Sequence, residues 1–140
     1  MNTNLQLQFQ KLLSKNNYRC TEERRVLFST LKNQSNPCTI QELVTATSGS
    51  LDPATVYRNV ELFEKLNVVH RVYTGWKYKV ELSDDFRDHH HHMTCTNCST
   101  ITSFEESSTL LNEFKKLESQ NNFKMTSHSL ELTGLCQNCC

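Results

Sequence analysis

The sequence of 140 residues has no uninterrupted apolar run as long as a membrane-spanning helix needs. Polar residues between Asn2 and Gln10 interrupt the basic and then apolar pattern of a secretion signal. A glycine-rich phosphate loop, a nucleophile elbow and an HExxH motif are also missing. These absences predict a cytoplasmic protein that is not an enzyme, with no membrane partner and no small-molecule substrate.

Charge is unevenly distributed along the chain, although 15 basic and 15 acidic residues give a formal net charge of zero. Residues 1–80 hold 11 Lys and Arg against 6 Asp and Glu, whereas residues 81–140 hold 4 against 9. Such a split indicates two functional halves. The basic half suits a polyanionic partner, and the acidic half, which is rich in His and Cys, suits cations.

Helix signals dominate the first half. A helical spacing of apolar residues begins at Leu5, and Thr21 precedes two glutamates that favour a helix N-terminus. Thr39–Glu42 has the pattern of a capping box, and Asp52-Pro53 combines an N-cap with proline at the first helical position. These signals predict four helices before residue 67.

The last of these helices separates a buried stripe from a polar face. Val56, Val60 and Phe63 recur at helical spacing and form the stripe. Thr55, Tyr57 and Arg58 therefore lie mostly off the buried face, where they are available to a partner.

Two strands follow, predicted at 68–73 and 77–82. Gly75 at the first position of a two-residue loop favours a type II′ turn. That turn pairs Tyr73 with Tyr78, and His70 with Glu81. Helices followed by a hairpin predict a winged-helix DNA-binding domain over residues 1–82.

The composition changes at residues 83–88, a polar acidic stretch that predicts a hinge. Beyond it, strand-like runs lie at 92–95 and 100–104, a helix at 107–120 and a further strand at 123–132. Residues 89–140 are therefore predicted to form a small α/β domain, and the whole chain an α+β fold.

Seven cysteines include two CxxC pairs separated by 37 residues. Two such pairs supply four thiolates, which close a tetrahedral structural zinc site with no open position. A thiol redox motif needs only one pair, in a βαβ context, and it predicts no tightly held zinc. Cys20 and Cys38 are interpreted as packing residues, and Cys140 as an alternative ligand. The predicted zinc ligands are Cys95, Cys98, Cys136 and Cys139.

Four consecutive histidines, His89–His92, precede the first CxxC pair. Side chains of an extended segment alternate between two faces, so this run can serve two metal sites. Neutral imidazole suits zinc, iron, nickel and copper. The hairpin register adds a histidine and a carboxylate to one face, which gives a predicted regulatory site of His70, Glu81, His90 and His92.

The other face needs partners from the second half. His128 on the last predicted strand is the strongest candidate, and a glutamate near the helix would complete the set. Glu113 is the first choice for that carboxylate, with Glu105 and Glu106 as alternatives. The predicted second site is His89, His91, His128 and Glu113.

Several motifs together resemble the ferric uptake regulator family of metal-dependent bacterial repressors, over nearly the whole chain. They are Arg19-Cys20-Thr21 followed by Arg24, then Thr55–Arg58, the run from His89 to Cys98, and the segment from His128 to Cys139. The resemblance implies a homodimer that binds AT-rich palindromic operators and represses metal-homeostasis genes when the sensed metal is bound. It implies DNA contacts from Arg19, Thr55, Tyr57 and Arg58.

The sensed metal is predicted from the ligands and from departures from the family pattern. Residues 36–38, before the third helix, lack the histidine that iron and peroxide sensors usually have there, which favours zinc. Glu81 stands where the zinc-uptake branch often has cysteine, and this harder ligand admits iron or manganese. Iron, manganese or peroxide sensing is therefore the alternative. In another class, a metal-storage protein explains the ligands but not Thr55–Arg58 on a capped helix.

Overall fold

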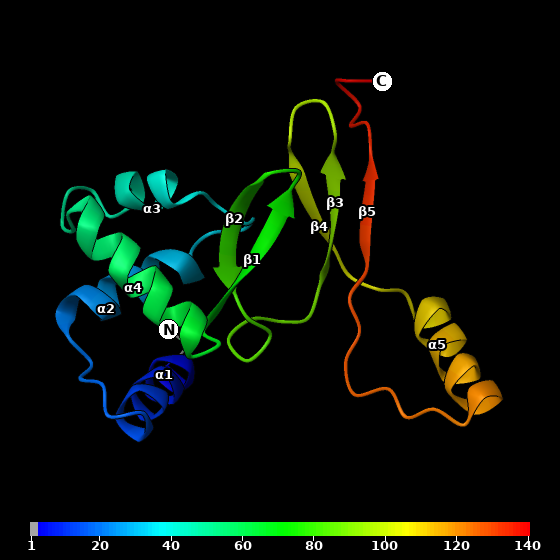
Figure 1. The fold of residues 1–140 in the computed structure, drawn as a ribbon, viewed down its shortest axis with the longest axis horizontal. Helices are drawn as coiled ribbons and strands as arrows, with labels where there is room; N and C mark the ends of the chain where they lie inside the picture. Colours follow the sequence, from blue (N-terminus) through cyan, green and yellow to red (C-terminus); the bar gives the residue numbers. More distant parts are fainter. Residues whose placement is uncertain (1–2) are drawn as a thin grey trace. The chain divides into compact units, whose positions relative to one another are not determined.

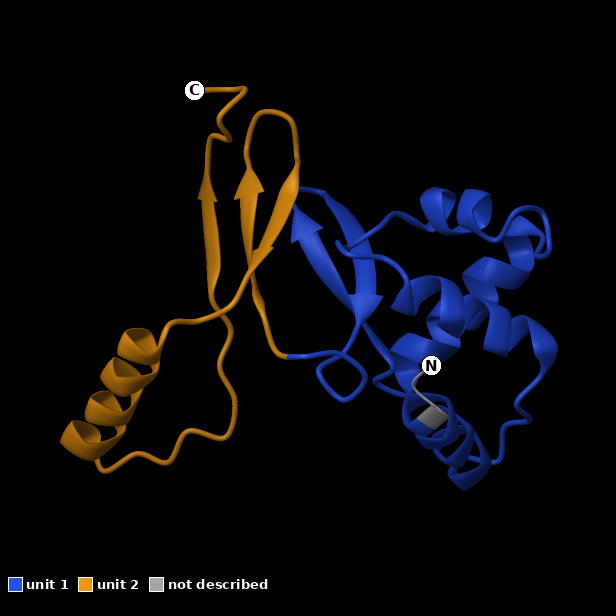
Figure 2. Ribbon diagram, turned by 180° about the vertical axis from the view of Figure 1, so that it is seen from behind, with its two compact units in different colours: residues 1–88 blue, residues 89–140 orange. Residues whose placement is uncertain are grey.

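The computed structural model describes residues 3–140 in two compact units (Figures 1 and 2). The first unit ends at Asp88 and the second runs from His89 to Cys140. No helix in the described part of the chain combines the length and apolar character needed to cross a bilayer. The architecture is α+β, as the sequence predicts.

The first unit is a helical layer followed by a β-hairpin, in the order expected of a winged helix (Figure 1). Within residues 3–140, the hairpin strands pair with each other and, through a single bridge between Cys38 and Val80, with the segment before α3. The elements are α1 (Thr3–Lys15), α2 (Glu22–Lys32), α3 (Ile40–Ala46), α4 (Pro53–Lys65), β1 (Val69–Thr74) and β2 (Lys77–Leu82).

The helix starts are built as their sequence signals indicate, with one difference. At α3, the N–H of Glu42 donates to Thr39 Oγ1 at 3.1 Å and the N–H of Thr39 donates to Glu42 Oε2 at 2.6 Å. At α4, Asp52 Oδ1 accepts from the N–H of Thr55 at 3.0 Å. Thr21 occupies the N-cap of α2, but its side chain makes no capping hydrogen bond.

A cluster of phenylalanine rings forms the centre of the first core. Phe9 of α1 stacks on Phe28 of α2 with 4.3 Å between centroids, and it meets Phe63 of α4 edge-on at 5.1 Å. Phe86 completes the cluster at 5.4 Å from Phe28 and is 3% exposed. Part of the segment 83–88 therefore packs into the first core, and the hinge over this segment stays a prediction.

The hairpin has the predicted register. His70 pairs with Glu81, Arg71 with Val80 and Tyr73 with Tyr78. Gly75 adopts φ of +64°, a conformation that glycine takes without steric cost. Trp76 does not have a positive φ, which excludes a type I′ turn and agrees with type II′.

The second unit is a three-stranded sheet with one helix, the small α/β arrangement that the sequence predicts (Figure 2). The central strand β3 pairs antiparallel with β4 and parallel with β5. Its elements are β3 (His91–Cys95), β4 (Ile101–Phe104), α5 (Ser108–Asn121) and β5 (Glu131–Gly134).

The predicted strand over 123–132 is wrong for most of its length, because pairing begins only at Glu131. Asn122 ends α5 in the left-handed conformation, and the N–H of Met125 donates to Glu118 Oε1 at 2.6 Å. The chain is thus held against the end of α5 before it returns to the sheet. Residues 123–130 form this return segment.

The apolar face of α5 is only partly covered within the second unit. Among the described residues, none of α5 is buried, and Leu117 is 55% exposed. Phe123, directly after the helix, is 66% exposed. The sequence predicts an apolar face here, and the second unit leaves most of that face open.

Replacing Phe9 with alanine is expected to lower the free energy of unfolding of the first unit by about 3–5 kcal/mol, because the ring is fully buried between two others. Urea unfolding followed by circular dichroism measures the change. Leu7→Ala is the matched control, since Leu7 lies on the same helix but is 48% exposed. Equal midpoints for the two variants would contradict the assignment of Phe9 to the core.

Candidate metal centres

Parallel pairing of β3 and β5 brings the two CxxC pairs to the same end of the sheet. Cys95 ends β3 and lies opposite Gly134, which ends β5. The N–H of Thr96 donates to Gly134 O at 2.8 Å and fastens the two strand ends together. Cys98 lies three residues after the end of β3, and Cys136 lies two residues after the end of β5. All the thiols of both pairs therefore emerge at this end of the sheet.

The four sulfur atoms of Cys95, Cys98, Cys136 and Cys139 lie within 4.8 Å of one another. Cys98 Sγ and Cys136 Sγ are 3.7 Å apart, too far for a disulfide. Thiolates bound at about 2.3 Å to a tetrahedral zinc stand about 3.8 Å from each other. The arrangement therefore fits a tetrahedral zinc ion.

Backbone donors and neighbouring sulfurs set the acidity of these thiols. The N–H groups of Cys98 and Cys136 lower the pKa of Cys95 to about 6, so this thiol ionises readily. The N–H of Asn138 lowers the pKa of Cys136, but the sulfurs of Cys139 and Cys98 outweigh it and raise that pKa to about 11. Several thiolates in one place repel each other, and a divalent cation removes that cost.

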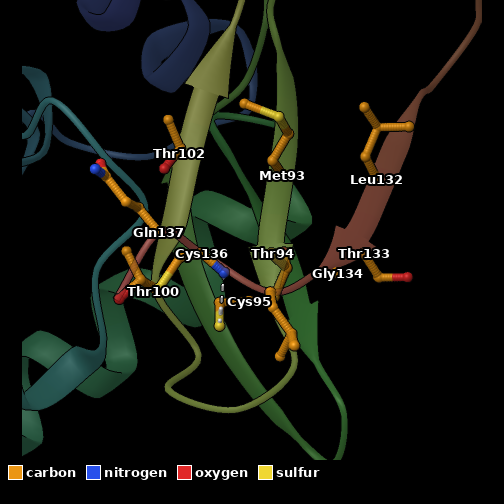
Figure 3. A pocket seen from close by; sticks show the side chains of 11 residues that line it. Met93, Thr94, Cys95, Thr100, Thr102, Leu132, Thr133, Gly134, Cys136 and Gln137 are labelled. Atoms are coloured by element: carbon orange, nitrogen blue, oxygen red, sulfur yellow. Dashed lines mark hydrogen bonds between the residues drawn. The ribbon is translucent and has the colours of Figure 1, made fainter. Parts of the chain in front are cut away.

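Next to these thiols, one side of the sheet is hollowed (Figure 3). The hollow has a volume of about 370 Å³ and is lined by residues of β3, β4 and β5 and of the segment after β5. Met93 and Leu132 lie side by side on it, and they are 41% and 45% exposed. Cys95 also lines it, and its sulfur accepts from the N–H of Cys136 at 3.4 Å.

A second cluster combines three histidines and one carboxylate. His89, His91, Glu106 and His128 each offer a ligand atom within 4.8 Å of the others. Glu106 Oε2 lies 2.7 Å from His91 Nε2 and 2.6 Å from His128 Nε2. His89 Nε2 is 3.2 Å from His128 Nε2. Three imidazoles and a carboxylate, all from the second unit, are a donor set suited to a divalent transition metal.

Glu106 supplies the carboxylate of this cluster, whereas the sequence pattern predicted Glu113 first. Glu106 lies just before the N-cap of α5, next to the sheet, whereas Glu113 lies on α5 and pairs with Lys116 at 2.6 Å. Hydrogen bonds, first from His91 and then from His128, lower the pKa of Glu106 and keep it ionised. Helix spacing alone could not distinguish these glutamates, because the position of Glu106 near the histidines depends on the course of the chain from β4 into α5.

The residues of the predicted regulatory site fall in different units. In the first unit, His70 Nε2 lies 2.9 Å from Glu81 Oε1, and Arg87 Nη1 lies 3.0 Å from Glu81 Oε2. The hydrogen bond to Glu81 raises the pKa of His70. In the second unit, the rings of His90 and His92 lie 4.9 Å apart. Each pair is formed within its own unit, and a site shared by both pairs stays a prediction.

The predicted DNA-contacting side chains of α4 lie on its outer face. Tyr57 is 50% exposed, and Arg58 is exposed with its Nη2 donating to Thr55 Oγ1 at 3.2 Å. Thr55 Oγ1 in turn donates to Asp52 Oδ2 at 2.6 Å. The capping residue of the helix thus also orients the first polar side chains of its exposed face.

Beside this face lies a polar hollow, lined by Arg24, Thr55 and Asn59 among others, that sequence spacing alone did not reveal. Arg24 Nε donates to Asn59 Oδ1 at 3.2 Å and so joins α2 to α4. The guanidinium also lies 5.5 Å from the ring centre of Tyr18 and donates to the carbonyl of Arg19. Arg24 belongs to the motif that begins at Arg19, whereas Asn59 had no sequence signal beyond its place on α4.

Comparisons with known proteins agree on one family. The model of the ferric uptake regulator family matches residues 15–133. A ferric uptake regulation protein of Campylobacter jejuni is 30% identical over 137 residues, covering 94% of this chain and 85% of that protein.

Solved structures share the fold. The ferric uptake regulator Fur of Helicobacter pylori, whose structure is described as having three functional metal binding sites, gives a TM-score of 0.81 at 19% identity, covering 96% of this chain and 91% of that one. A zinc uptake regulator complexed with zinc and DNA gives a TM-score of 0.60 at 20% identity, covering 98% and 95%. At these identities the two structures establish the fold alone.

Replacing Cys136 with serine is expected to release tightly held zinc from the purified protein, because three thiolates no longer close the tetrahedron. Elemental analysis after gel filtration measures the loss. Cys140→Ser is the control and is expected to keep its zinc, since the Cys140 thiol donates to the carbonyl of Leu135, at 3.7 Å, and lies outside the group of four sulfurs. Zinc retained by the first variant and lost from the second would make Cys140 the ligand.

Replacing Glu106 with glutamine is expected to weaken metal binding at the second cluster by about tenfold or more, because one charged ligand is lost. Competition with a chromophoric chelator measures the affinity, using protein whose four cysteines are already loaded with zinc. Glu113→Gln, which changes a glutamate on α5 that pairs with Lys116, is expected to bind like the unaltered protein. The reverse ranking would restore Glu113 as the ligand.

Proposed function

The chain belongs to the ferric uptake regulator family, and on this premise we propose that it is a repressor that binds DNA as a homodimer when a regulatory metal is bound. Members of the family are metal-responsive transcription regulators, so the metal-storage and thiol redox alternatives fall away. The observation that supports the proposal best is that one chain combines an exposed polar face on a capped α4 with clusters of metal ligands.

In this proposal, α4 reads the major groove of an AT-rich palindromic operator. Tyr57 and Arg58 reach the base edges, and Thr55 and Arg19 contact the backbone or the groove edge. The excess of basic residues in 1–80 supplies phosphate contacts, which makes the affinity depend on salt concentration. The likeness in fold to a zinc uptake regulator complexed with zinc and DNA supports this proposal.

A second copy of the chain is the partner proposed for the second unit. The open apolar face of α5 and the sheet side with Met93 and Leu132 need cover from water. All residues of β5 are exposed, and β5 is an edge strand available for pairing. A homodimer would bury these surfaces and present two copies of α4 to a palindrome.

Zinc is the proposed structural metal at the four cysteines, and zinc is also the first choice for the sensed metal. His70, Glu81, His90 and His92 are the proposed regulatory ligands, and His89, His91, Glu106 and His128 the proposed second site. Both sets are rich in imidazole, which suits zinc, but each contains a carboxylate, which also suits iron and manganese. Iron, manganese or peroxide sensing within the family is therefore the alternative.

The proposed mechanism is a shift between conformations of the two domains, 1–82 and 89–140, about a hinge at 83–88. Metal held jointly by His70, Glu81, His90 and His92 would select the arrangement in which both copies of α4 fit the operator. The metal shifts this equilibrium only by its difference in affinity for the two arrangements. By linkage, operator binding would tighten metal binding by the same factor.

The decisive experiment is fluorescence anisotropy with labelled DNA from upstream of this protein's own gene. The protein starts with zinc only at its cysteines, and zinc, iron(II) and manganese(II) are then titrated separately in metal buffers. Saturable binding that appears only with metal supports the proposal. The free concentrations at which the three metals act, compared with the usual affinity order that favours zinc, indicate the sensed metal. Binding that is equal with and without metal would refute the proposal that metal controls DNA binding.

Replacing Arg58 with alanine is expected to weaken operator binding by about 1–3 kcal/mol while metal uptake stays unchanged, because Arg58 lies on the exposed face of α4 and belongs to none of the metal-ligand clusters. Lys65→Ala, at the other end of the same helix, is the control and is expected to have a much smaller effect. Anisotropy titrations at fixed salt compare the two. Wild-type affinity for the operator in the Arg58 variant would contradict the assignment of α4 to the DNA interface.

A further inference from the structure

The turn between β1 and β2 carries the only tryptophan of the sequence, and this side chain is fully exposed. Trp76 has a relative exposure of 104%, although a large aromatic side chain gains free energy by burial. The turn does not need an aromatic residue at this position, because Gly75 already supplies the positive φ. An indole held in water at the tip of a hairpin indicates a contact with a partner.

The surroundings of Trp76 indicate the charge of that partner. Residues 71–80 contain three Lys and Arg and no Asp or Glu. Lys77, next to Trp76, is exposed, and Tyr73 on the facing strand is 58% exposed. A basic segment with exposed aromatic rings at its end matches a polyanion that also offers apolar surface, as duplex DNA does in its grooves.

The hairpin is fixed firmly to α4. Arg71 of β1 forms an ion pair with Glu64 of α4, with 2.7 Å between Nε and Oε1. The guanidinium of Arg71 also lies 4.3 Å from the ring centre of Tyr78 on β2. Val69 and Val80 anchor the base of the hairpin in the first core. The strands that carry the turn are therefore tied to α4.

We infer that the turn Thr74–Lys77 is a second DNA contact, with the indole of Trp76 entering the minor groove next to the major groove that α4 occupies. The inference rests on the proposed function, in which α4 reads the DNA. The minor groove is about 6 Å wide, which admits a single flat ring but no helix. Apolar side chains at such positions pack against sugars or between base steps, while neighbouring lysines contact phosphates.

Because Trp76 is the sole tryptophan, its own fluorescence reports on the contact. The full-length, zinc-loaded protein is excited at a wavelength that DNA does not absorb, with a saturating unlabelled duplex from upstream of its gene or an AT-rich palindrome. Saturation is set by anisotropy in a parallel sample. We expect the free protein to be quenched strongly by acrylamide, and the DNA complex to show a clear loss of quenching. Zinc without DNA is the control and is expected to leave the quenching unchanged.

Variants separate a contact from mere proximity. Trp76→Ala is expected to weaken operator binding about tenfold, equivalent to about 1.4 kcal/mol, through the loss of apolar contact. Trp76→Phe keeps a flat ring and is expected to recover most of the affinity. Both variants are expected to keep the unfolding midpoint, because the side chain is fully exposed.

The outcomes distinguish the inference from the function on which it rests. Tight, metal-dependent DNA binding with unchanged acrylamide quenching, or with wild-type affinity in Trp76→Ala, would overturn the wing contact and leave the repressor intact. Protection of Trp76 that appears with rising protein concentration and without DNA would assign the turn to self-association instead. Failure of every duplex to bind would overturn both.

Discussion

The second unit has almost no hydrophobic core, and this constraint governs the rest of the molecule. Among its described residues, Cys95 and Ile101 are the only buried apolar side chains, and one of these two is a candidate metal ligand. A unit of this size gains too little from burial to order its backbone unaided. In the proposed function, metal ligation and surface covered by a second chain supply the missing stability. The polar contacts agree, because the most buried imidazole of the second cluster, His91, lies against a carboxylate.

The first unit is built on the opposite principle. Its four clustered phenylalanines and its well-capped helices give it a core that needs no metal. Such a body can hold α4 and the hairpin in a constant mutual position, which a reader of DNA requires. A unit that becomes ordered only when it binds metal ions is suited to sensing them, since the free energy of metal binding then also drives its folding. The unequal cores thus fit the proposed division between a rigid DNA-binding unit and a metal-dependent sensing unit.

Local chemistry accounts for what the sequence predicted well. Asp52-Pro53 and the Thr39–Glu42 box specify helix starts through hydrogen bonds between near neighbours, and a two-residue turn at Gly75 dictates the hairpin register down to His70 opposite Glu81. The failures involve chain paths over longer distances. Residues 123–130 have strand-like composition, but their course is decided by the left-handed Asn122 and the bond from Met125 to Glu118. In the same way, the course of the chain from β4 into α5 brings Glu106 rather than Glu113 to the histidines. The periodicity of the helix carries no information on that course.

The parallel pairing of β3 with β5 links the two metal clusters of the second unit. One end of this pairing brings Cys95 beside Gly134 and so gathers the four thiols, while His91 begins β3 at its other end, where His128 leads into β5. A zinc ion at the cysteines would fix the register of β5 against β3. Since His128 is three residues before β5, the same register determines how far its ring reaches toward His89 and His91. Loss of the cysteine cluster would therefore disturb the histidine cluster at the opposite end of the strands, although the two clusters share no ligand. The structural metal would in this way be a precondition for metal binding at the second site, and the order of filling would run from the thiols to the imidazoles.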